Sequence, residues 1–104
     1  MARFEINQPS DLVRHYRHRT KKRFGQHFLV DPGILDNLIA EAGVEADEPV
    51  LEIGPGCGTL TWRLLEHGAR VTAVELDRDA IAFLSDEAPF GEDFEPVEGD
   101  ALEV

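Results

Sequence analysis

The fold is decided by the stretch Val50-Leu51-Glu52-Ile53-Gly54-Pro55-Gly56-Cys57-Gly58-Thr59. Its apolar first residues are typical of a buried parallel strand, and its glycines are typical of a tight turn into a helix. In open α/β sheets, ligands bind where such strands end. The stretch therefore predicts a turn that a ligand approaches closely, although glycines alone also make ordinary tight turns.

The flanking segments continue the alternation of helices and strands. Asp31 and Pro32 are suited to begin a helix, and Gly43 is suited to end it. Proline has no N–H to donate to a sheet, so Pro96 places the third strand at an edge, in the order 3-2-1. The elements predicted after the turn are a helix that Gly68 closes, a strand over 71–74, a helix that Asp77 caps and an extended segment over 94–98. The pattern is that of an α/β protein with a parallel sheet.

Two acidic residues follow the ends of the second and third predicted strands. Glu75 lies 21 residues past Gly54, where its carboxylate can accept hydrogen bonds from both ribose hydroxyls of an adenosine cofactor. Asp100 is placed to accept a hydrogen bond from the adenine amine. Three strand ends are therefore expected to converge on one nucleoside.

The spacing of the glycines separates two such cofactors. A dinucleotide fingerprint has glycine or alanine three positions after its second glycine, and that position here is Thr59. Glu52 also places a carboxylate beside the loop, which disfavours a pyrophosphate but tolerates the sulfonium and ammonium of S-adenosylmethionine. The residues favour S-adenosylmethionine over NAD; a glycine turn with two incidental acids is the alternative.

The charge is divided unevenly along the chain. The formal net charge is -11, yet residues 1–23 are net +5 and the remainder is net -16. Such asymmetry is typical of a basic arm for an anionic partner or of a solvated tail. We therefore divide the chain into a basic N-terminal arm over 1–23 and a domain over 24–104.

Length and composition exclude several classes of protein. A chain of 104 residues has room for one domain, and no apolar run approaches the length that spans a membrane. Cys57 is the single cysteine, which excludes an internal disulfide and a cysteine-rich zinc cluster. We expect a cytoplasmic protein without a metal site.

Four blocks resemble the small-subunit rRNA adenine N6,N6-dimethyltransferase family, over nearly everything from Lys21 to Leu102. They are Lys22-Arg23-Phe24-Gly25-Gln26-His27-Phe28-Leu29, Leu51-Glu52-Ile53-Gly54-Pro55-Gly56-Cys57-Gly58, Val74-Glu75-Leu76-Asp77 and Gly99-Asp100-Ala101-Leu102. The glycine loop alone is typical of methyltransferases at large, whereas the first block narrows the family. The resemblance implies the N-terminal half of a Rossmann-like S-adenosylmethionine-dependent methyltransferase fold.

The resemblance also implies a set of residues that bind S-adenosylmethionine. The first block would close over the methionine end of the cofactor, with His27 where asparagine is more usual. The glycine loop would line the methionine part, Glu75 of the third block would hold the ribose, and the last block would hold the adenine. The implied cofactor-binding residues are Gln26, His27, Leu29, Gly54, Gly56, Glu75, Leu76, Asp100 and Ala101.

The family's catalytic motif, Asn-x-Pro-aromatic after a fourth strand, has no counterpart here. Asn7-Gln8-Pro9 is followed by Ser10 and precedes the sheet, so it does not fit. We therefore expect no catalytic residue in this chain, which would bind cofactor without turnover, whereas its family methylates N6 of adenines in small-subunit rRNA. The free edge of the first strand would also invite self-association.

Two other functions remain open. One is an S-adenosylmethionine-dependent enzyme with a substrate other than rRNA, which would share the glycine loop and both acids. The other is a non-catalytic module whose basic arm binds RNA.

Overall fold

A computed structural model describes residues 4–20 and 28–103 of the chain. In chain order, its helices and strands are α1 (Pro9–Thr20), α2 (Pro32–Ala42), β1 (Pro49–Ile53), α3 (Thr59–Glu66), β2 (Arg70–Glu75), α4 (Arg78–Asp86) and β3 (Phe94–Glu98). The alternation predicted after residue 31 is confirmed. None of these helices is long and apolar enough to cross a membrane.

The strands form one parallel sheet in the order β1-β2-β3. The register pairs Ile53 with Val74 and Glu75 with Glu98, so the carboxyl ends of all three strands meet at one end of the sheet. Pro96 lies in the outer strand β3, as its missing N–H predicted. The predicted order 3-2-1 is confirmed.

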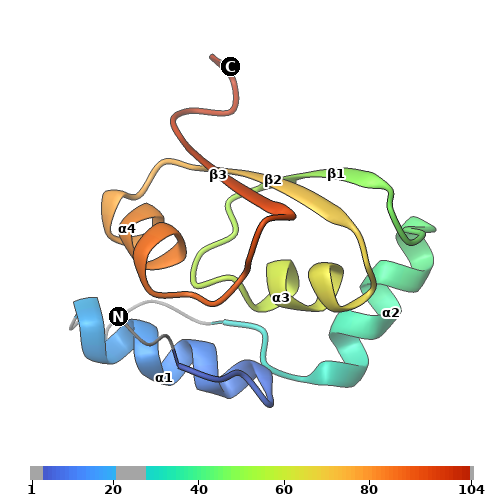
Figure 1. The fold of residues 1–104 in the computed structure, drawn as a ribbon, viewed down its shortest axis with the longest axis horizontal. Helices are drawn as coiled ribbons and strands as arrows, with labels where there is room; N and C mark the ends of the chain where they lie inside the picture. The colour runs from blue at the N-terminus through green and yellow to red at the C-terminus, as the bar shows by residue number, and fades with distance from the viewer. Residues whose placement is uncertain (1–3, 21–27, 104) are drawn as a thin grey trace.

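The helices gather on one side of the sheet, and within the described residues its other face carries no helix (Figure 1). The covered face packs in two clusters, one around Phe83 and Leu84 of α4 and one around Val71 and Ala73 of β2. On the uncovered face, Leu51 is 64% exposed and Ile53 is 65% exposed. A large apolar area of the sheet therefore faces solvent.

Helix α2 begins and ends as the sequence predicted. The Asp31 carboxylate accepts hydrogen bonds from the N–H groups of Gly33 and Ile34, and Gly43 ends the helix in the left-handed conformation. Ile39 packs into the cluster around β2, so the helix contacts the sheet layer as expected.

Helix α1 was not predicted, and it lies inside the segment assigned to a basic arm. Its start is capped, because the Asp11 carboxylate accepts hydrogen bonds from the N–H groups of Asn7 (2.9 Å) and Gln8 (3.1 Å). Leu12 and Tyr16 are buried in the same cluster as Phe83. Part of the expected arm is therefore packed into the body formed by the rest of the chain.

Candidate functional site

The glycine loop leaves β1 and enters α3 through a series of left-handed residues. Gly54, Gly56 and Gly58 have φ values of 70°, 61° and 91°. The Gly54 N–H donates to the Val74 carbonyl at 2.8 Å, which fixes the loop against the end of β2. A Cβ on Gly54 would meet no atom within 4 Å, so this side of the loop is open. The loop presents backbone to solvent where a ligand can approach closely.

Glu75 ends β2 and is tied to the glycine loop by its side chain. One carboxylate oxygen accepts a hydrogen bond from the Gly56 N–H at 3.0 Å, and the other accepts from the Asp77 N–H at 2.9 Å. A carboxylate has about four lone-pair sites, so each oxygen can still accept another donor. The arrangement holds a half-buried carboxylate in one orientation, with capacity to bind a pair of hydroxyls.

The end of β3 lies beside the end of β2. The Gly99 N–H donates to the Glu75 carbonyl at 2.9 Å, and the Asp100 carboxylate accepts from the Leu102 N–H at 2.9 Å. Ala101 lines a hollow of about 270 Å³ on the open face of the sheet, together with Ile53 and Val74. The structure thus brings the glycine loop, Glu75 and the Asp100 turn to one end of the sheet.

Four predicted cofactor-binding residues remain, namely Leu29, Leu76, Gln26 and His27. Leu29 is 39% exposed and Leu76 is 69% exposed, so neither is held in the core. Gln26 and His27 lie outside the described residues.

Glu52 is a buried carboxylic acid on β1, two residues before Gly54 of the open loop. It is 9% exposed, and its Oε1 accepts a hydrogen bond from the Thr61 hydroxyl at 2.5 Å. Burial raises the pKa of Glu52 from 4.5 to about 7; the bond from Thr61 opposes this rise, and the negative charge of Glu75 adds to it. Near neutral pH the group is therefore close to half protonated.

We expect this group to make stability depend on pH. Between pH 4.5 and about 7, the folded chain holds a proton on Glu52 that the unfolded chain has released, so stability falls as pH rises through this window. Through this group, the unmodified chain should lose up to roughly 3 kcal/mol of stability between pH 5 and pH 8. Glu52→Gln should abolish this part of the pH dependence. Denaturant unfolding at both pH values measures this difference, with the exposed Glu95→Gln as control. Equal pH dependence in Glu52→Gln and the unmodified chain would contradict the prediction.

Two residues that shape the site gave no clear signal in the sequence. Thr61 is fully buried next to Glu52, and only its polar character in an apolar helix could have pointed to it. Phe28 belongs to the first of the four blocks that resemble the family. Its contact with Gly56 joins segments that are distant in the sequence, so no local pattern could predict it.

Cys57 has the structural role that its type predicts. The side chain is fully buried, and burial raises the pKa of its thiol to about 12, so it is not a thiolate nucleophile. Within residues 4–20 and 28–103, no group of three or more His, Cys, Asp or Glu side chains could hold a metal ion.

Known methyltransferases are similar to this chain. Ribosomal RNA small subunit methyltransferase A of Clostridium acetobutylicum is 42% identical over 104 residues, which cover all of this chain and 37% of that protein. The chain therefore spans little more than a third of this relative's length. The crystal structure of a dimethyladenosine transferase from Plasmodium falciparum matches with a TM-score of 0.60 and 36% identity, over 75% of this chain and 29% of that chain.

A further structure is similar in fold. The glycopeptide N-methyltransferase MtfA, solved in complex with S-adenosylmethionine, matches with a TM-score of 0.54 and 28% identity, over 76% of this chain and 38% of that chain. The fold is thus the Rossmann-like fold of S-adenosylmethionine-dependent methyltransferases. Residues 17–104 match the family model described as Ribosomal RNA adenine dimethylase, and the chain belongs to that family.

Proposed function

We propose that this chain binds S-adenosylmethionine at the carboxyl ends of its three strands. The observation that carries the proposal is the fixed carboxylate of Glu75, held between the Gly56 and Asp77 N–H groups at the end of β2. In this role Glu75 accepts from the ribose hydroxyls, Asp100 and Ala101 hold the adenine, and Gly54 lies under the methionine part.

The proposed site has four further members. They are Leu29, Leu76, Gln26 and His27, of which the last two come from the family resemblance alone.

The charges around the loop support a cationic cofactor. Glu52 lies within electrostatic reach of Glu75, and their mutual repulsion contributes to the raised pKa of Glu52. A pyrophosphate would add further negative charge to this region, whereas a sulfonium and an ammonium would relieve the repulsion. The MtfA complex shows that a similar fold accommodates S-adenosylmethionine.

Calorimetric titration of the chain tests the proposal. We expect saturable binding of S-adenosylmethionine and no saturable binding of NAD under the same conditions. A chain that binds NAD, or that binds neither compound, would contradict it.

For the whole protein, we propose methyl transfer from S-adenosylmethionine to N6 of adenines in small-subunit rRNA, in the cytoplasm. Family membership and the name of the Clostridium relative support this activity. The sequence carries no Asn-x-Pro-aromatic motif, so the 104-residue chain would bind cofactor without turnover.

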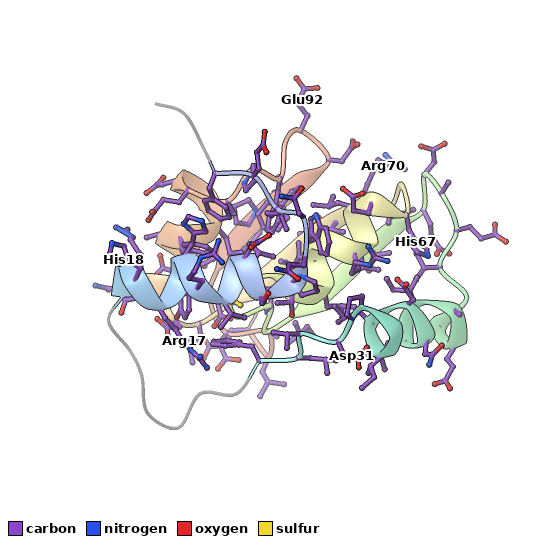
Figure 2. The ribbon with its side chains drawn as sticks, turned by 90° about the horizontal axis from the view of Figure 1, so that it is seen from below. Arg17, His18, Asp31, His67, Arg70 and Glu92 are labelled. Carbon is purple, nitrogen blue, oxygen red and sulfur yellow. The ribbon has the colours of Figure 1, made fainter. Side chains whose placement is uncertain are left out.

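The outward face of α1 supports RNA as the partner. Arg14, Arg17 and His18 are exposed on this helix, whose other face is buried, and Figure 2 shows Arg17 and His18 projecting from its C-terminal end. Their spacing places them on one side of the helix. In a chain that is otherwise acidic, this face is suited to contact RNA phosphates.

We also propose self-association through β1. Within the described residues this strand pairs only with β2, and its neighbouring face exposes Leu51 and Ile53. Size-exclusion chromatography should show concentration-dependent dimers. A strict monomer at all concentrations, with cooperative melting, would contradict self-association.

A further inference from the structure

The ring of Phe28 lies between the basic helix and the glycine loop. It makes an edge contact with Tyr16 of α1, with ring centroids 5.6 Å apart. The Arg17 guanidinium lies over the same ring, 5.8 Å from its centroid, within the range of a cation–π interaction. Both contacts come from the helix that carries the exposed basic face.

The opposite contact of Phe28 is with the loop. A Cβ on Gly56 would lie 3.2 Å from Phe28 Cε1, so the ring lies close to the loop at a position where a side chain would crowd it. The N–H of that same glycine donates to Glu75 Oε1 at 3.0 Å. A displacement of the ring would therefore move Gly56 and disturb the orientation of the Glu75 carboxylate.

These contacts form one continuous series, from Arg17 through Phe28 and Gly56 to Glu75. We propose that Phe28 is a positioning residue that couples α1 to the glycine loop, so that RNA phosphates held on α1 and the cofactor raise each other's affinity. This inference rests on the proposed function. A phosphate paired with Arg17 keeps the guanidinium over the Phe28 ring, and the ring then holds Gly56 in place. The Glu75 carboxylate is thereby oriented to accept hydrogen bonds from the ribose hydroxyls.

The experiment measures the affinity for S-adenosylmethionine with and without a saturating oligoadenylate of ten nucleotides. For the unmodified chain, we expect oligoadenylate to tighten cofactor binding about fivefold, at the lower end of typical coupling between sites. Phe28→Leu should bring this factor close to one, because the shorter side chain no longer spans Tyr16, Arg17 and Gly56. Phe28→Tyr keeps the ring and should restore most of the coupling.

Phe94→Leu is the matched control. Phe94 is also half-buried against the core cluster and also makes an edge contact, with Phe90 at 5.0 Å. It lies at the start of β3, opposite the strand ends that form the site. The control should lose comparable thermal stability while it keeps the coupling.

Each outcome separates the two proposals. If the unmodified chain binds no S-adenosylmethionine, the proposed function fails and the coupling fails with it. If the cofactor binds but oligoadenylate does not change its affinity, only the coupling is wrong. If the coupling survives in Phe28→Leu, it arises from direct attraction between RNA and the cationic cofactor. That result would overturn the role of Phe28.

Discussion

Glu75→Gln is expected to weaken the affinity of the chain for S-adenosylmethionine by about a hundredfold. The variant keeps the size of the side chain but removes the charge that strengthens two hydrogen bonds to the ribose, each worth about 1.5 kcal/mol or more. In the unmodified chain, the Gly56 and Asp77 N–H groups both donate to the carboxylate. The variant turns an amide NH₂, which is also a donor, toward one of these two N–H groups. Calorimetric titration gives the dissociation constants directly.

Glu98→Gln is the control for this substitution. Glu98 pairs with Glu75 in the sheet register and is also at a strand end, but its carboxylate lies near Arg78 at 3.4 Å and is half exposed. We expect its cofactor affinity to stay within about twofold, since exposed ion pairs contribute little. Thermal unfolding of both variants confirms that they are folded at the titration temperature. Equal affinities for Glu75→Gln and the unmodified chain would remove Glu75 from the cofactor site.

Local signals in the sequence were sufficient for the helices and strands after residue 28. Asp31 and Gly43 mark α2 because their roles depend on a few neighbouring residues, namely a side-chain cap and a left-handed turn. Pro96 located β3 at the edge because it lacks an N–H, whatever the rest of the sheet does. The convergence of Glu75 with the glycine loop followed from the same reasoning, because parallel strands end together.

The features that escaped prediction depend on contacts between distant segments. In α1, basic residues dominate, and the few apolar ones, Leu12, Val13 and Tyr16, are buried because α3 and α4 pack against this helix. The bond between Thr61 and Glu52 and the contact of Phe28 with Gly56 likewise require the assembled fold. Glu52 was expected beside the loop, but burial and the resulting pKa near neutrality could not be derived from spacing.

Gly58→Ala is expected to lower the free energy of unfolding by about 3 kcal/mol and the melting temperature by roughly 15 °C. Gly58 has a φ of 91°, which an alanine adopts only with strain. The added Cβ would also lie 2.8 Å from Phe90 Cζ and 2.9 Å from Leu84 Cδ2, both buried in the core cluster. The two costs add because one is in the backbone and the other is in packing.

Gly91→Ala separates these two costs. Gly91 has a φ of 76°, but a Cβ there would meet no atom within 4 Å, so only the backbone strain of about 1 kcal/mol applies. Denaturant unfolding should therefore show a clearly larger loss for Gly58→Ala. Equal losses would mean that the core relaxes around the new methyl group. A larger loss for Gly58→Ala would show that the third glycine of the loop is required for close packing against α4 and Phe90.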